Sequence, residues 1–331
     1  MAPAQPLHIV VDTAHARCHL PLVIDPCQEK CPHGCLYCYA RGLTGDPFEA
    51  KDINGIARLF QEAFERRADA PWHKLLRKRI PIRVGFANEP LPPLESGNEF
   101  TLRLMEIFNR FDYPYLIISK SALLAEPPYR EMISPKNATV HISITTLDPE
   151  LAALVEPHAP PPELRLETIR RLCAAGVWTV ARLDPLIGKI RKGDALLPYF
   201  SLALLRAAQR HQARGLLVGL LAPPSRRLEA DAASGDITFP GDAAGDRVLL
   251  QDIRDCCRQM RLPCSFCRLG SPWRELDDIE ALFPHDANCC QLNPRVLPGT
   301  LTLDERIRLA PLSGIKKAEL RLFNFLADRL R

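Results

Sequence analysis

Short apolar runs rich in β-branched residues alternate with longer segments of helical periodicity along most of this chain. Such alternation is typical of repeated strand and helix units that build a parallel sheet. The expected strands are residues 20–24, 82–86, 115–119, 139–145, 177–183 and 215–221. The expected helices, which carry apolar residues three and four positions apart, are residues 53–66, 99–111, 162–175, 196–212 and 247–260. This pattern predicts an α/β fold in which the chemistry lies at the carboxyl ends of the strands.

The length and composition allow one large barrel with a small addition. A chain of 331 residues, of which 47% are hydrophobic and 25% charged, buries a substantial core. We expect a barrel core over residues 1–222, followed by a loop, a last barrel helix and a cysteine-rich C-terminal extension over residues 223–331. The sequence has neither a leader pattern nor a run of about eighteen apolar residues, so we expect a cytoplasmic protein that does not associate with membranes.

The most informative motif is the run CPHGCLYC over residues 31–38. Cys31, Cys35 and Cys38 are separated by three and then two residues, and three such thiolates can hold a [4Fe-4S] cluster whose fourth iron is open to another ligand. The alternative is a zinc site that recruits His33 or Cys27 as its fourth ligand. A disulfide framework is disfavoured, because it is typical of short secreted chains.

The spacing, together with Tyr37 directly before the last cysteine, resembles the cysteine motif of the radical S-adenosylmethionine (radical SAM) enzymes. This resemblance implies a partial (β/α)6 TIM-type barrel that holds a [4Fe-4S] cluster on Cys31, Cys35 and Cys38, with SAM on the free iron. It also implies an enzyme that cleaves SAM reductively to a 5'-deoxyadenosyl radical, which abstracts a hydrogen atom from a substrate. The electron then comes from a reductant such as flavodoxin or ferredoxin.

Further segments resemble the radical SAM branch typified by spore photoproduct lyase. They are residues 35–41, 116–121, 141–150, 156–157 and 182–188. The resemblance spans roughly residues 18 to 222. It implies that Lys120, after the third expected strand, contacts the SAM carboxylate, and that Ser143 contacts the ribose hydroxyls.

The same resemblance supplies the other candidates for cofactor binding. They are Tyr37, Tyr39, Asn88, Glu89 and Arg182. The two tyrosines are expected beside the adenine, and the asparagine and glutamate at the SAM amino group; a solvated turn is the alternative for this pair. Arg182 and Asp184 are expected to bind SAM, to line the substrate pocket, or to form a buried salt bridge at the barrel mouth. The basic run 188–193 that follows is typical of a solvated turn.

These motifs leave the substrate open. Spore photoproduct lyase uses a further cysteine as a hydrogen-atom donor, and no cysteine here aligns with it, so thymine-dimer repair is not carried over. A nucleic acid base, a peptide or a small molecule are the candidates, and a nucleic-acid repair or modification enzyme is the main alternative. The net charge of +4 neither demands nor excludes a nucleic acid. A non-catalytic zinc or Fe-S binding module is a further alternative.

A second group of cysteines lies in the last third of the chain, where Cys264 and Cys267 form a Cys-x2-Cys pair. Together with Cys289 and Cys290 they are candidates for an auxiliary [4Fe-4S] cluster, with zinc or simple burial as alternatives. Cys257 is a reserve ligand. The remaining cysteines divide into two expected core residues, Cys173 and Cys256, and two without an assigned role, Cys18 and Cys27.

Overall fold

The computed structural model describes residues 8–9, 20–26, 31–38, 40, 52–92, 95–221, 237–239, 243–267, 281–283, 288–296, 299–302 and 305. Tyr39, Cys18 and Cys27 lie outside the described residues. So does most of the expected loop after residue 222.

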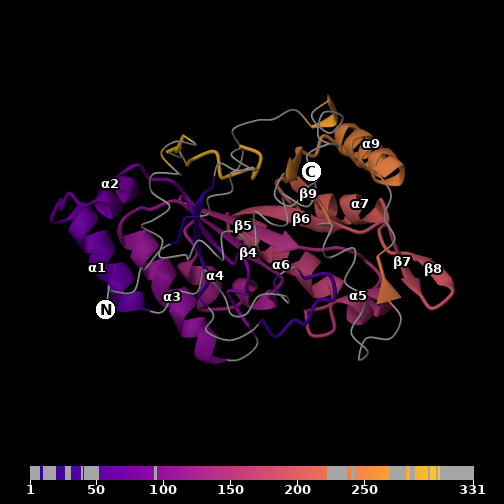
Figure 1. Cartoon of the computed structure of the whole chain (residues 1–331), viewed down its shortest axis with the longest axis horizontal. Helices are drawn as coiled ribbons and strands as arrows, with labels where there is room; N and C mark the ends of the chain where they lie inside the picture. Colours follow the sequence, from indigo (N-terminus) through magenta and orange to yellow (C-terminus); the bar gives the residue numbers. More distant parts are fainter. Residues whose placement is uncertain are drawn as a thin grey trace.

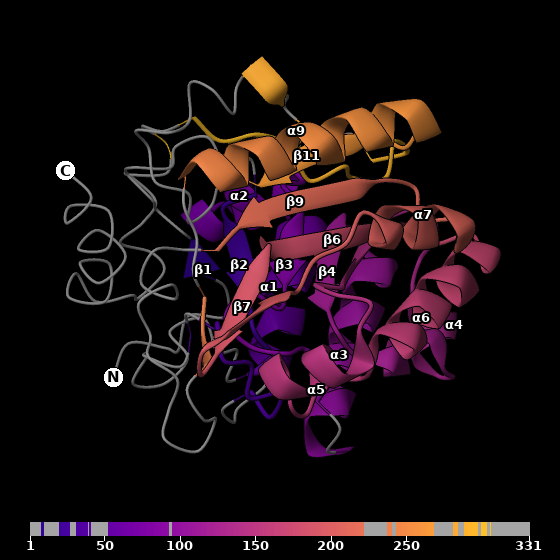
Figure 2. The same cartoon turned by 90° about the vertical axis from the view of Figure 1, so that its right-hand side faces the viewer.

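The fold is built on an eight-stranded sheet with the order β1-β2-β3-β4-β5-β6-β9-β11 (Figure 2). Its strands are β1 (His8–Ile9), β2 (Leu22–Ile24), β3 (Ile82–Val84), β4 (Tyr115–Ser119), β5 (Ala138–Ser143), β6 (Trp178–Leu186), β9 (Leu216–Leu220) and β11 (Cys264–Cys267). Within the described residues of this eight-stranded sheet every pairing is parallel except that of β1 with β2. The six expected strands are confirmed, and β11 adds a parallel strand that we had placed in the C-terminal extension. The arrangement is that of a partial TIM-type barrel.

Helices cover the outer side of this sheet (Figures 1 and 2). They are α1 (Ile53–Phe64), α2 (Pro71–Arg77), α3 (Glu95–Arg110), α4 (Tyr129–Met132), α5 (Pro149–Val155), α6 (Pro162–Ala174), α7 (Ala203–Arg210) and α9 (Ala243–Met260), with a 3-10 turn, η2, over Ala122–Ala125. At the start of α5 the Asp148 carboxylate accepts hydrogen bonds from the amides of Glu150 and Leu151, and this cap begins the helix. No helix in the described part of the chain is both long and apolar enough to cross a membrane.

Alternate side chains of the strands enter two buried layers. The outer layer packs under the helices and joins Ile82 of β3 to aromatic residues such as Phe60 and Phe108, whose ring centroids are 5.8 Å apart. The inner layer faces the barrel interior. Its buried residues are Leu20, Leu116, Val180, Leu217, Cys267, Cys290 and Leu292.

Residues 196–212, expected as one helix, divide into a strand and a shorter helix. β7 (Lys189–Lys192) and β8 (Ala195–Pro198) form a hairpin, and β10 (Ile237–Thr238) pairs with β7 (Figure 1). The helix prediction was wrong at its start because Pro198 has no N–H group for a helix interior, and the hairpin satisfies this stretch of backbone instead. The basic side chains of residues 189–192 are exposed, as a solvated run predicts, but they lie on strand β7 and not in a turn.

A C-terminal segment, residues 288–296, closes the end of the barrel where the strands begin. Asn293 is 3% exposed, and its backbone N–H donates to the hydroxyl of Thr139 at 2.8 Å. Its side-chain amide donates to three carbonyl oxygens between residues 135 and 138, at 2.9 to 3.3 Å. Nearby, the Gln291 amide donates to the carbonyl of Leu216 at 2.7 Å. This part of the expected extension therefore packs into the barrel itself.

We predict that Asn293→Ala lowers the free energy of unfolding by about 1–3 kcal/mol, because it leaves buried carbonyl groups without donors. Urea unfolding monitored by circular dichroism measures this loss. The matched control is Asn54→Ala on the exposed face of α1, which should leave the transition unchanged within error. Equal behaviour of the two variants would show that the segment does not hold the barrel closed.

Candidate active site

The cysteine loop, residues 31–38, lies across the carboxyl ends of the parallel strands. It follows β2, and its Leu36 amide donates to the carbonyl of Val155 at 2.9 Å. The amide of His158 in turn donates to the carbonyl of His33 at 3.2 Å. Because Val155 ends α5 and His158 lies in the turn that follows it, the loop is fastened by backbone hydrogen bonds to the strand–helix unit of β5 and α5.

Burial keeps two of the loop's thiols uncharged. Burial first, and then the Glu89 carboxylate and the neighbouring thiols, raise the pKa of Cys31 to about 12. Burial raises the pKa of Cys35 to about 11, although Lys120 acts in the opposite direction. A metal centre that binds these thiols as thiolates must therefore displace their protons, as is usual for cysteine ligands.

The geometry of the three cysteines is compatible with an iron–sulfur cluster. Cys35 and Cys38 both act electrostatically on Cys31, so their thiols lie near that of Cys31. In the described part of the chain no three Cys, His, Asp or Glu side chains are grouped around a single metal ion. A [4Fe-4S] cluster binds each cysteine through a different iron atom, so its ligands need not meet at one point.

A buried carboxylate, Glu156, fixes the aromatic residue of the cysteine loop. The Tyr37 hydroxyl donates to Glu156, and the Thr145 hydroxyl donates to the same carboxylate oxygen at 2.9 Å. Arg165 of α6 pairs with the other oxygen at 2.5 Å, and both side chains of this ion pair are almost fully buried. Burial would raise the pKa of Glu156, but Arg165 and Lys120 outweigh it and lower the pKa.

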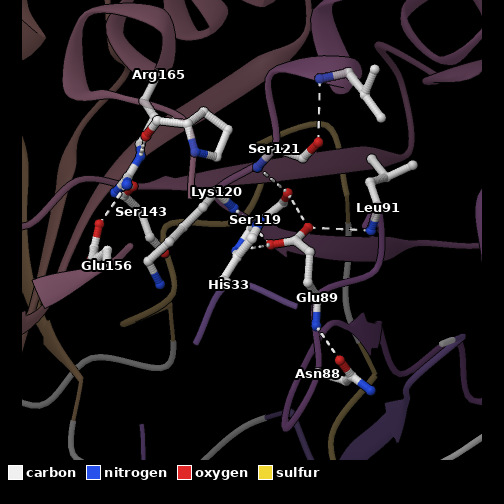
Figure 3. Close-up of polar contacts among 12 residues, drawn as sticks. His33, Asn88, Glu89, Leu91, Ser119, Lys120, Ser121, Ser143, Glu156 and Arg165 are labelled. Carbon is white, nitrogen blue, oxygen red and sulfur yellow. Dashed lines mark hydrogen bonds and ion pairs between the residues drawn. The ribbon is translucent and has the colours of Figure 1, made fainter. Parts of the chain in front are cut away.

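A second carboxylate, Glu89, ties the loop to the ends of β3 and β4 (Figure 3). It accepts hydrogen bonds from the Ser119 hydroxyl at 2.5 Å and from the backbone amides of Leu91 and Lys120 at 3.2 and 3.1 Å. The Nδ1 atom of His33 lies 3.5 Å from the Oε2 atom of Glu89. The Glu89 side chain therefore points inward and holds the backbone of the barrel mouth together.

The loop that precedes Glu89 is shaped by Gly85 and by Asp25, which sequence analysis had missed. Gly85 has φ +84°, and a Cβ atom there would lie 2.4 Å from the carbonyl oxygen of Ile118, so no other residue fits. The Asp25 carboxylate, directly after β2, accepts hydrogen bonds from the amides of Phe86 and Ala87 at 2.6 and 2.7 Å. An acidic residue immediately after a buried strand was the available signal.

Lys120 lies between the two carboxylates (Figure 3). Its Nζ atom is 5.5 Å from the centre of the Tyr37 ring, and the side chain is half-buried. Burial would lower its pKa, but Cys35, Glu156 and Glu89 outweigh burial and raise the pKa, so the ammonium group stays charged. Ser143 ends β5 in a buried position, and its carbonyl accepts a hydrogen bond from Arg165 at 3.3 Å.

Arg182 forms the buried salt bridge that was one of its expected roles. It donates to Asp184, two residues further along β6. It also lies 3.7 Å from the sulfur of Cys267 and 3.4 Å from Nδ1 of His141. The group therefore links three strands, β5, β6 and β11, inside the barrel.

The C-terminal cysteines do not come together as one ligand set in the described residues. Cys264 belongs to the layer under the helices and contacts the thiol of Cys257 on α9, whereas Cys267 faces the barrel interior. Residues three apart on a strand point to opposite faces, so this Cys-x2-Cys spacing separates its thiols. Cys289 and Cys290 contact each other on the interior side. Cys173 and Cys256 are buried, as expected.

The comparisons with known proteins bear on the fold. No family model and no curated protein matches the sequence. Among solved structures, the fold is shared with spore photoproduct lyase and with SuiB. Spore photoproduct lyase complexed with dinucleoside spore photoproduct is 13% identical, with a TM-score of 0.53, and the match covers 78% of each chain.

The second group of similar structures is SuiB from Streptococcus suis. SuiB bound to S-adenosylmethionine is 15% identical, with a TM-score of 0.50, and the match covers 74% of this chain. SuiB bound to precursor peptide SuiA is 14% identical, with a TM-score of 0.51 over 80% of this chain. The match takes in 49% and 54% of SuiB in these two structures, so the chain spans about half of that protein.

We predict that Glu156→Gln lowers the free energy of unfolding by about 3–5 kcal/mol, because Arg165 then stays buried without a counter-charge. A double variant, Glu156→Leu with Arg165→Met, should recover part of this loss, since it leaves no unpaired charge. Chemical denaturation under anaerobic conditions measures both. The control, Glu167→Gln, breaks an exposed pair with Arg170 and should have no resolvable effect. If Glu156→Gln were as mild as the control, the carboxylate would not organise the site.

Proposed function

We propose that this protein is a radical SAM enzyme that holds a [4Fe-4S] cluster on Cys31, Cys35 and Cys38. The observation that carries the proposal is the position of this cysteine loop. It lies at the carboxyl ends of a radical SAM barrel, fastened between Glu89 and Glu156, with a charged lysine beside it. When bound, the cluster supplies the electron that cleaves SAM reductively and so begins hydrogen-atom abstraction.

The chain's own residues bind and orient SAM in this proposal. The ammonium group of Lys120 attracts the SAM carboxylate, because its raised pKa keeps it positive. The Tyr37 ring, held by its hydroxyl on Glu156, forms a wall for the adenine. Ser143 and the backbone of Tyr39 complete the contacts to the nucleoside. Tyr37 is held by Glu156, and Lys120 and Ser143 are held at the ends of β4 and β5, so the positions of these three groups exist before the ligand arrives.

In this proposal the two polar residues of the loop after β3 have different roles. We assign to Asn88 the contact with the SAM amino group; its side-chain oxygen accepts a hydrogen bond from the Glu89 amide at 2.9 Å. Glu89 is engaged by Ser119 and by two backbone amides, so we assign it the positioning of this loop and of His33. Removing Glu89 should disturb both the cysteine loop and the SAM site.

The proposal includes a reductant of the flavodoxin or ferredoxin type and leaves a nucleic acid, a peptide or a small molecule as substrate. The two similar solved structures hold ligands of different kinds: spore photoproduct lyase is complexed with a dinucleoside spore photoproduct, and SuiB is bound to a precursor peptide. We do not extend the proposal to a second cluster, because Cys264 and Cys267 face opposite sides of β11.

The first test is metal content. Anaerobically purified protein should contain about four iron and four sulfide ions per chain and give a reduced-cluster EPR signal that shifts when SAM is added. The Cys31/Cys35/Cys38 triple alanine variant should lose this iron, while Cys173→Ala, a buried thiol outside the loop, should keep it. Zinc without iron in the wild type would overturn the radical mechanism.

The second test concerns SAM affinity. Lys120→Met should raise the Kd for SAM roughly tenfold or more, because a charge-assisted contact to the carboxylate is lost. Isothermal titration of the cluster-loaded protein measures this change, at iron content equal to that of the wild type. Lys74→Met, an exposed lysine on α2, is the matched control. Unchanged affinity in Lys120→Met would remove the lysine from the SAM site.

A further inference from the structure

Arg83 is a buried guanidinium group without an acidic partner. It is the central residue of β3 and is 2% exposed. Among the described residues no carboxylate forms an ion pair with it, and its buried Nε atom has no hydrogen-bond partner. One terminal nitrogen donates to the carbonyl of Leu20 at 3.3 Å, and the group lies 4.3 Å from the centre of the Phe86 ring. A cation this deep needs compensation that these contacts supply only in part.

A second guanidinium group, that of Arg182, faces the same interior space. Both groups act on His141, whose pKa is lowered to about 3 by burial, by Arg182 and by Arg83. Both also act on the thiol of Cys290. The two cations are therefore close to the same pair of interior side chains, although they come from strands on different sides of β4 and β5.

The acidic groups of the described interior are already engaged. Asp184 pairs with Arg182, in a position that depends on Gly219, where a Cβ atom would lie 2.6 Å from the carboxylate. Asp25 accepts hydrogen bonds from two backbone amides of the loop after β3. His141 is neutral. The positive charge of Arg83 is thus left for a ligand to balance.

We propose that Arg83, with Arg182 as its neighbour, binds an anionic group of the substrate, a carboxylate or a phosphate, inside the barrel. The substrate role rests on the proposed function, whereas anion binding itself does not. The site is distinct from that of SAM, because Arg83 pairs in register with Leu116, four residues before Lys120 along β4. Four strand residues separate these backbone positions by about 13 Å.

The test uses the full chain with inorganic phosphate and with malonate as probes, in a chloride buffer of constant ionic strength. Thermal unfolding should show a saturable rise of a few degrees in Tm with at least one probe, since a ligand that binds only the folded state stabilises it. A phosphate response assigns a phosphorylated substrate group, and a malonate response a carboxylate. Arg83→Met should abolish the response, and Arg103→Met, an exposed arginine of α3, should keep it.

Two further readouts separate a binding role from a structural one. Without the probes, Arg83→Met should melt at or above the temperature of the wild type, because the variant no longer buries an unpaired charge. A much lower Tm would overturn the proposal in favour of a structural bond to Leu20. In the presence of saturating SAM the anion response should persist, and its loss would place the anion in the SAM site instead.

The outcomes also separate this inference from the proposed function. An anion response that depends on Arg83 in protein that contains no iron would support the site even if the radical mechanism failed. An iron-loaded, SAM-binding protein in which Arg83→Met responds to both probes like the wild type would overturn the anion site alone. Absence of a saturable response to either probe in the wild type would do the same.

Discussion

The geometry of the barrel mouth depends on the buried carboxylate of Glu156. It joins the cysteine loop through Tyr37, the end of β5 through Thr145, and α6 through Arg165. A buried ion pair adds little net stability, since the loss of hydration offsets the attraction. The network instead fixes the positions of its members, because moving any one of them leaves the remaining polar groups buried without a hydrogen-bond partner. The cysteine loop is held in place by this requirement.

Glu89 performs the corresponding task on the other side of the loop, through His33 and the strand ends. The two carboxylates explain why Lys120 can be half-buried and still charged. It lies in their combined negative potential, which Arg165 only partly cancels. A ligand that brings its own carboxylate to Lys120 therefore meets an oriented cation, and no protein group has to rearrange at that moment.

The sequence predicts the parallel strands well because each is a short run of β-branched residues that is buried on both faces. It fails at residues 196–202, where apolar spacing suits a helix but Pro198 and the hairpin partner determine the backbone.

The sequence also misses Arg165, which occupies the apolar stripe of α6 with Leu166 and Ile169 and so looks like an interruption of that helix's buried face. The role of Arg165 depends on its ion pair with Glu156, and only the tertiary structure brings these two residues together. Cys264 and Cys267 form a metal motif by spacing, and strand geometry separates them.

The interior of the barrel depends on the neutrality of His141. Were it protonated, three cations would face one another beside a single engaged carboxylate, Asp184, and folding would be opposed by their repulsion. Burial and the two arginines keep the imidazole uncharged, with its Nε2 atom bonded to the carbonyl of Cys290 at 2.9 Å. The interior thereby retains one unbalanced positive charge, at Arg83. In the proposed arrangement an anionic ligand restores neutrality there, while SAM binds a separate cation at the mouth, so the two ligands need not compete for one charge.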